Sequence, residues 1–437
     1  MPAMSILQLP RELLAHTLHY LTYIDLVSFS ATCHDAHSFV SPTNQLLWQA
    51  AFLQRFDDPR DRWNCLTKSV RQANLEREQA WDWFVELKKR AVALRWVDAD
   101  DYAGGSWDGQ SQEDSETLRV LETLLEIVDT AKICPTPEEV RAGKRAEVDD
   151  RELSKNLALL PTNYDFTTEF DGLVRGLPAS VVKKNTGYRY GVSDAAVSMP
   201  GGWHSPGRPN TRSQATVQWD KLVRSEAGSR LHVLCGLTQR EEKDEKALAR
   251  ARRVTYDWEL TEPRNEWGPL KVDGSGEVDW RRLESICVVV VRQFTMAIRG
   301  RMTLPQGFCF SFPYRTLSDP TQPEDWARAQ GTWMGTYVFM HWEGLVEFNT
   351  FRAASNRPTL EDGPESCGGL MKLELQLNMA LKDDPKLHTN LPICEDLPPL
   401  YFSGISRSCD FQMATFIRGM ACLAPGGKEV RWRYIVR

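Results

Sequence analysis

Cysteine and histidine side chains that could hold a metal ion gather near the start of the chain: His16, His19, Cys33, His34 and His37. A zinc site needs three or four such ligands to converge on one point. The helical pattern around them places Cys33 on an apolar face, where a cysteine packs as a small hydrophobic residue. We therefore predict a core cysteine beside exposed histidines, and no metal site.

Motifs for other chemistry are incomplete. Asp98, Asp100 and Asp101 resemble half of a calcium loop, but the glycine and the closing glutamate of such a loop are misplaced. Gly274 and Gly276 lack the lysine and the serine or threonine that complete a phosphate-binding loop. No nucleophile elbow or zinc-protease motif occurs. The sequence therefore predicts no cofactor and no catalytic residue.

The composition of the chain restricts its class and its compartment. The formal net charge of −6 argues against general binding to nucleic acid or to an anionic membrane. The longest apolar run, Ile286 to Val291, is too short to cross a bilayer, and the N-terminal stretch lacks the features of a signal peptide. The 10 cysteines include no C-x-x-C pair, which favours reduced thiols. We expect a protein of the cytoplasm, the nucleus or both.

The apolar residues at the N-terminus are spaced as in three short amphipathic helices. Pro10 suits the first position of a helix, where its missing N–H costs nothing. Leu14, Leu18 and Leu21 follow at i, i+4 and i+7, which is one apolar face. Asp25 can accept hydrogen bonds from first-turn amides, so it is the predicted N-cap of the second helix.

Three helices of this length cannot bury all of their apolar surface alone. We expect Leu9, Pro10 and Leu26 to stay partly bare on one side, which suits a protein partner. An ordinary three-helix cap on a larger domain is the alternative. The stretch closely resembles the F-box. The residues that carry the resemblance are Leu9, Pro10, Glu12, Leu13, Leu14, Asp25, Leu26, Cys33, Leu47 and Trp48.

This resemblance implies that the N-terminal helices dock on Skp1, which in turn docks on a cullin and its RING subunit. In the F-box family the distal domain holds a protein substrate for ubiquitylation, and the F-box chain itself does no bond chemistry. Two alternatives remain open: a Skp1-binding adaptor outside a ligase, and a closed sheet that holds a small apolar ligand. The predicted Skp1-binding residues are Leu9, Pro10, Leu13, Leu14, Leu18, Leu21, Asp25, Leu26, Leu47 and Trp48.

The order of the patterns predicts an α+β chain in three parts. They are an F-box at residues 5–56, a helical linker region at residues 57–160 and a β-rich substrate-binding domain at residues 161–437. One long helix is expected from about Ser69 to Val97, because its apolar residues keep a seam at helical spacing.

Alternating apolar and polar residues predict strands at 308–312, 371–379 and 430–436. Because turns rich in glycine and proline join them, we expect a mostly antiparallel sheet or barrel with a few helices. Segments such as LHVLCGLT and GKEVRWRYIV resemble a set of fungal F-box proteins. The segment GTWMGTY is distantly similar to the Gly-Thr-Tyr segment of the F-box 31 type.

Two segments are predicted to bind the substrate. Trp333, Tyr337 and His341 are expected in one strand, and Arg431 and Arg433 alternate along the last strand. Tryptophan and arginine often anchor binding hot spots, and the arginines would leave a positive face for an acidic or phosphorylated peptide. The alternatives are an edge protected by charge and tryptophans that serve only for packing.

Overall fold

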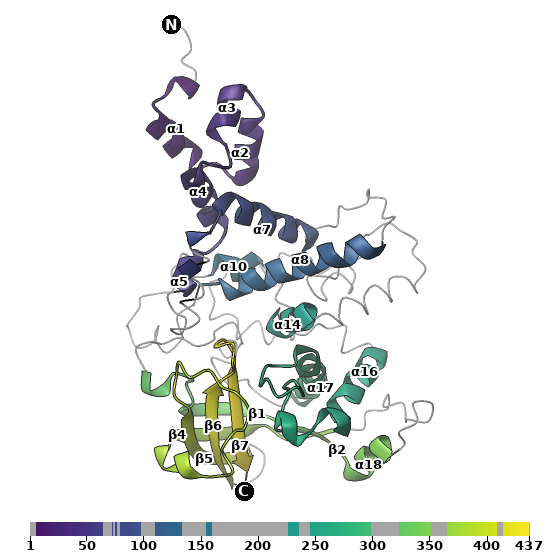
Figure 1. Ribbon diagram of the computed structural model, residues 1–437. Helices are drawn as coiled ribbons and strands as arrows, with labels where there is room; N and C mark the ends of the chain where they lie inside the picture. The colour runs from purple at the N-terminus through teal and green to yellow at the C-terminus, as the bar shows by residue number, and fades with distance from the viewer. Residues whose placement is uncertain are drawn as a thin grey trace.

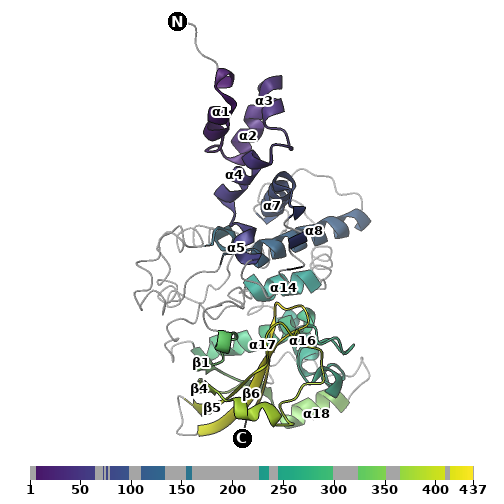
Figure 2. The same ribbon diagram turned by 60° about the vertical axis from the view of Figure 1, so that its left-hand side comes forward.

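The computed structural model is an α+β fold, as the sequence predicts (Figure 1). The N-terminal helices lie at one end of the molecule, further helices form a middle layer, and the main sheet lies at the other end (Figures 1 and 2). The three domain boundaries stay predictions. The structure describes residues 6–63, 72, 75–76, 79–97, 110–132, 154–159, 226–235, 245–298, 323–350, 365–408 and 414–436.

Four short helices follow a 3₁₀ turn, η1 (Ile6–Gln8): α1 (Arg11–Leu18), α2 (Tyr23–Ser30), α3 (His34–Phe39) and α4 (Gln45–Arg55). Thr22, not Asp25, is the N-cap of α2, because its hydroxyl oxygen accepts the Asp25 N–H at 3.3 Å. Cys33 is an exposed N-cap whose sulfur accepts the Ala36 N–H. The prediction of a core cysteine was wrong because α3, which the sequence pattern did not reveal, begins at this point.

A middle layer of helices extends the core of the N-terminal helices. Its members are α5 (Pro59–Trp63), α7 (Trp83–Val97), α8 (Gln110–Asp129), α10 (Lys155–Leu159) and α14 (Glu226–Cys235). One cluster of buried side chains joins Leu26 of α2 and Phe52 of α4 to Leu87 of α7, Leu124 of α8 and Leu231 of α14. Since these side chains leave water together, the N-terminal helices and the middle layer form one packed unit.

Three further helices lie beside the main sheet: α16 (Glu245–Tyr256), α17 (Trp280–Ile298) and α18 (Trp342–Thr350). α17 packs on both α14 and α16. No helix in the described part of the chain is long and apolar enough to span a membrane. The 3₁₀ turns are η3 (Trp258–Leu260), η4 (Pro263–Asn265), η7 (Pro323–Asp325) and η8 (Met379–Asp383).

The main sheet is antiparallel throughout and has the order β1-β4-β5-β6-β7. Its described strands form an open sheet with β1 and β7 at the edges, so it is not closed into a barrel. A separate pair consists of β2 (Val338–Met340) and β3 (Glu365–Cys367). The main strands are β1 (Gly331–Gly335), β4 (Met371–Leu377), β5 (Leu400–Ser408), β6 (Ala414–Leu423) and β7 (Val430–Val436).

Both faces of the main sheet are covered by other parts of the chain, and the residues of a strand alternate between the two faces. Phe402 and Trp432 lie in the core of one face, which Trp326 covers. Tyr401 and Met420 lie on the other face, under a loop that includes Leu387. The strands predicted at 371–379 and 430–436 are confirmed as β4 and β7, with Met379 instead in η8. The strand predicted at 308–312 lies outside the described residues.

Candidate functional site

Burial divides the ten predicted Skp1-binding residues into two groups. Leu14, Leu18, Leu26, Leu47 and Trp48 are buried and belong to the core that α4 shares with α7. The expectation that Leu26 is partly bare was wrong, because its exposed fraction is 0%. The remaining five are exposed or half-buried, so they can meet a partner without unfolding: Leu9, Pro10, Leu13, Leu21 and Asp25.

A second set of apolar side chains points to solvent from these helices. Tyr20 is 71% exposed, Ile24 55%, Val27 54% and Leu46 80%. Sequence periodicity missed Ile24 and Val27, because α2 has apolar residues on more than one face and only one face packs inward. We refer to the four exposed residues and Leu13, which is 53% exposed, as the docking face, and a partner at this surface stays a prediction.

Gln45 joins the docking face to the middle layer. Its side chain donates to Asp82 Oδ1 at 3.0 Å and accepts the Trp83 N–H at 2.8 Å. Asp82 also accepts the Val85 N–H, and this backbone hydrogen bond holds the pKa of Asp82 below its ordinary value. The helix predicted from Ser69 is therefore interrupted, and α7 begins at Trp83 with its first amides capped.

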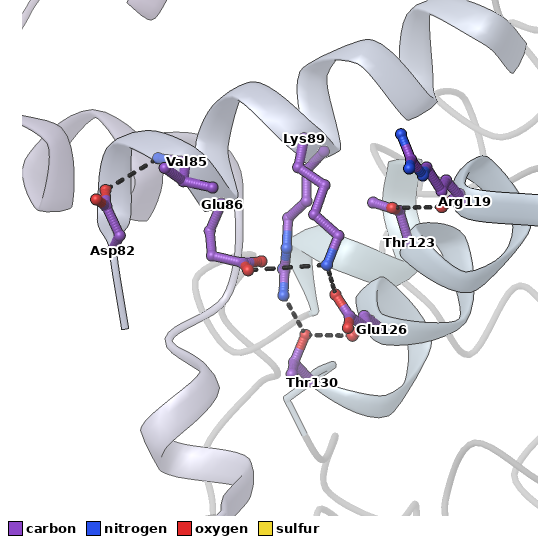
Figure 3. A network of polar contacts seen from close by, with 9 residues as sticks. Asp82, Val85, Glu86, Lys89, Arg119, Thr123, Glu126 and Thr130 are labelled. Carbon is purple, nitrogen blue, oxygen red and sulfur yellow. Dashed lines mark hydrogen bonds and ion pairs between the residues drawn. The ribbon is translucent and has the colours of Figure 1, made fainter. Parts of the chain in front are cut away.

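Arg90 of α7 is fully buried at the junction of α4 and α8. Its guanidinium lies 4.9 Å from the ring centre of Phe52 and 5.3 Å from that of Phe56. It also donates to the Thr130 hydroxyl at 3.0 Å. Figure 3 shows the neighbouring ion pair between Lys89 and Glu126, close to Thr130. These contacts fix α7 against both neighbours.

The carboxylate of Asp57, just after α4, binds two segments that are distant from it in sequence. Its oxygens accept the N–H groups of Lys132 and Lys155, each at 2.9 Å, and the Ser154 hydroxyl. The Asn156 side chain accepts the Asp57 N–H and donates to the Ile127 carbonyl oxygen. The end of α4, the end of α8 and the start of α10 are therefore held together.

A cluster of charges joins the middle layer to the main sheet. Asp129 at the end of α8 pairs with Arg230 of α14 at 3.1 Å and with Lys428 of the β6–β7 turn at 3.2 Å. Arg230 also pairs with Glu429 at 3.4 Å. Burial raises the pKa of Glu429, and the positive charge of Arg230 partly offsets this rise. Contacts therefore continue from the N-terminal helices to the sheet.

The three residues predicted to share one substrate-binding strand do not do so. Trp333 lies in β1, its ring 5.4 Å from that of Trp432, and its indole N–H donates to the Ala329 carbonyl oxygen. Tyr337 directly precedes β2 and His341 directly follows it, and β2 belongs to the other sheet. Two residues between β1 and β2 separate the sheets, and this break left no signal in the sequence pattern.

Arg431 and Arg433 lie on the covered face of β7 rather than on a free basic face. Arg431 is buried and donates to the Thr389 hydroxyl at 2.9 Å. Arg433 pairs with Glu266 at 2.9 Å. The prediction of a free positive face was wrong, because the segments that carry Thr389 and Glu266 fold over β7 and bind both guanidinium groups. A substrate-binding role for either arginine stays a prediction.

Comparison with known families agrees with the N-terminal geometry. The F-box domain family matches residues 6–44, which span η1 to α3 and reach the start of α4. The chain therefore contains an F-box domain, and such domains generally bind Skp1 within SCF complexes. Neither curated proteins nor solved structures gave a match to the chain. The likeness to the fungal set and to the F-box 31 type stays a prediction.

Proposed function

We propose that this chain is the substrate receptor of an SCF-type ubiquitin ligase. The docking face binds Skp1, which links the chain to a cullin and a RING subunit. The part beyond the middle layer holds a protein substrate. The chain itself is non-catalytic, and it acts by raising the effective concentration of a substrate lysine near the charged E2.

The observation that carries the proposal is the concentration of exposed apolar side chains on the F-box helices. Leu13, Tyr20, Ile24, Val27 and Leu46 are all more than half exposed. Exposed apolar surface of this kind marks a protein interaction site, because its burial releases free energy roughly in proportion to area. The buried leucines of the same motif serve to build the helices that present this face.

The packing of the middle layer supports a receptor over a loosely attached adaptor. Asp57 and Arg90 each bind groups from more than one element of the chain. A substrate held through such a junction keeps a restricted range of positions relative to Skp1. A flexible tether would spread it over many positions and lower its effective concentration near the E2.

Charge placed on the docking face tests the Skp1 contact directly. In Ile24→Arg a cation must be buried without a partner at the interface, so we expect Skp1 co-purification to be lost. Val92→Arg is the matched control, because Val92 is 45% exposed on α7 and is not one of the residues of the docking face. Leu26→Arg is a poor test, since Leu26 is fully buried and its replacement would unfold the F-box itself.

The ligase role needs a second measurement in the native cell. Proximity labelling under proteasome inhibition should recover a cullin with the wild type and not with Ile24→Arg. Proteins that the wild type labels and that accumulate under inhibition are the substrate candidates. Skp1 recovered without any cullin would contradict the ligase role and favour an adaptor outside a ligase.

A further inference from the structure

Aromatic side chains gather on the outer face of the small β2–β3 sheet. Val338 and Met340 of β2 pack inward against helices. Tyr337, Phe339 and His341 alternate with them, and Tyr337 is 51% and Phe339 42% exposed. The Tyr337 and Phe339 rings stack at 5.9 Å, and the His341 ring meets Phe339 edge-on at 5.6 Å. The three rings form a continuous stripe.

The stripe is held in place by β3 and the residues after it. A Cβ atom on Gly368 would lie 2.3 Å from the Tyr337 ring, so only glycine lets the ring lie against the backbone there. Gly368 also donates its N–H to the Tyr337 carbonyl oxygen at 2.8 Å. The Ser366 hydroxyl lies 3.1 Å from His341 Nε2. Because this exposed surface is already fixed, it loses little conformational entropy when it binds a partner.

A pair of exposed tryptophans lies at the end of β2, and one of them directly follows the stripe in the chain. Trp342 follows His341 directly, is 70% exposed, and lies 6.2 Å from Trp258, which is 40% exposed. Asn349 of α18 fixes the pair, because its side chain accepts the Trp258 backbone N–H at 3.0 Å and donates to the Tyr256 carbonyl oxygen at 3.0 Å. The aromatic surface comprises Tyr337, Phe339, His341, Trp342 and Trp258.

Carboxylates accompany these tryptophans. Glu343 follows Trp342, Glu259 follows Trp258, and Glu347 lies one helical turn beyond Glu343. All three side chains are exposed, and the charged residues of η3 and α18 are all acidic. Aromatic faces attract cations, and nearby carboxylates strengthen that attraction. The chemistry of this surface therefore matches a basic side chain.

We propose that the aromatic surface is a docking site for an extended substrate segment that places a lysine or arginine against Trp342 and Trp258. Apolar side chains of the same segment lie along the stripe of Tyr337 and Phe339. This inference rests on the proposed receptor function and names the chemistry of the substrate. It differs from the acidic or phosphorylated peptide expected from the arginines of β7.

The test uses the full chain bound to Skp1 and two pools of short fluorescent peptides. The pools have equal apolar content, one enriched in lysine and arginine and the other in aspartate and glutamate. Fluorescence anisotropy should show preferential binding of the basic pool, weakened by added salt. Trp342→Ala should weaken it about tenfold, and Glu343→Lys should weaken it in the same direction. The controls are Phe416→Ala, an aromatic residue 68% exposed on β6, and Glu395→Lys, an exposed carboxylate.

Equal binding of the two pools, preference for the acidic pool, or no binding of either would overturn the inference. So would equal losses in Trp342→Ala and Phe416→Ala. Sedimentation covers the other occupant: a dimer that Trp342→Ala abolishes would show that a second copy of the chain covers this surface. Each variant must retain Skp1, so failure here is distinct from failure of the docking face, which Ile24→Arg tests.

Discussion

Asp57 and Asn156 lie 99 positions apart in the sequence and are joined by reciprocal hydrogen bonds. The Asp57 backbone N–H donates to Asn156 Oδ1 at 2.9 Å, and the Asn156 backbone N–H donates to Asp57 Oδ2 at 3.4 Å. Both residues are buried, so neither bond competes with water. The pair ties the residue that follows the C-cap of α4 to α10 and thereby sets how α4 meets the middle layer.

Removal of the Asp57 carboxylate should destabilise this junction. Asp57→Ala leaves several buried donors without an acceptor, so we expect the free energy of unfolding to fall by about 3 kcal/mol. The control is Asp58→Ala, because Asp58 forms a partly exposed pair with Arg60 and should cost about 1 kcal/mol or less. Urea denaturation measures both, and equal losses in the two variants would contradict the role given to Asp57.

The buried pair of Arg252 and Glu365 should show strong coupling. The exposed fractions of these side chains are 1% and 0%, and the pair links α16 to β3, the strand that pairs with β2. Arg252→Met or Glu365→Leu alone leaves one buried charge and should cost about 3–5 kcal/mol. The double variant should cost less than the sum of the two. Additive losses in a double-mutant cycle would show that the pair is not coupled.

Glu429 should make stability depend on pH with a defined sign. Burial raises its pKa above the ordinary value, opposed by Arg230 and Lys428. The folded chain therefore binds this proton more tightly than the unfolded chain, and the contribution to stability is lost as pH rises through the folded pKa. As the pH rises above the ordinary glutamate pKa of 4.5, the wild type should lose stability relative to Glu429→Gln. A relative gain over that range would contradict the sign.

Charge reversal on β7 should act on stability before it acts on binding. Arg433→Glu places a carboxylate beside Glu266, and we expect a loss of about 1 kcal/mol or more in the free energy of unfolding. Arg407→Glu is the control, since Arg407 is 52% exposed on β5 and pairs with Glu374. If Arg433→Glu is as stable as the wild type, loss of substrate by that variant would support a binding role.

Strands β4 and β7 were predictable from the sequence because each alternates between environments of different polarity. Leu375 and Trp432 face the core of the main sheet, and their neighbours face the other way. The loop over Arg431 was not predictable, since alternation does not say what covers a polar face. For the same reason, the spacing of Arg431 and Arg433 led to the incorrect prediction of an open basic surface.

The F-box motif was predictable as a set of residues, but not the direction in which each side chain points. Leu26 and Ile24 are two positions apart on α2, and one is fully buried while the other is 55% exposed. Both are apolar, so hydrophobicity cannot separate the residue that builds the helix packing from the one that meets a partner. Only the placement of α2 against the rest of the core decides between them.

Hydrogen–deuterium exchange of the chain with and without Skp1 tests the central claim most directly. Skp1 should slow exchange in α1, α2 and the first turn of α4, which carry the docking face, and leave β4 and the β2–β3 sheet unchanged. Ile24→Arg should abolish that protection, and Val92→Arg should keep it. Protection confined to the sheet domain, or none in the F-box helices at saturating Skp1, would contradict the assignment of the docking face.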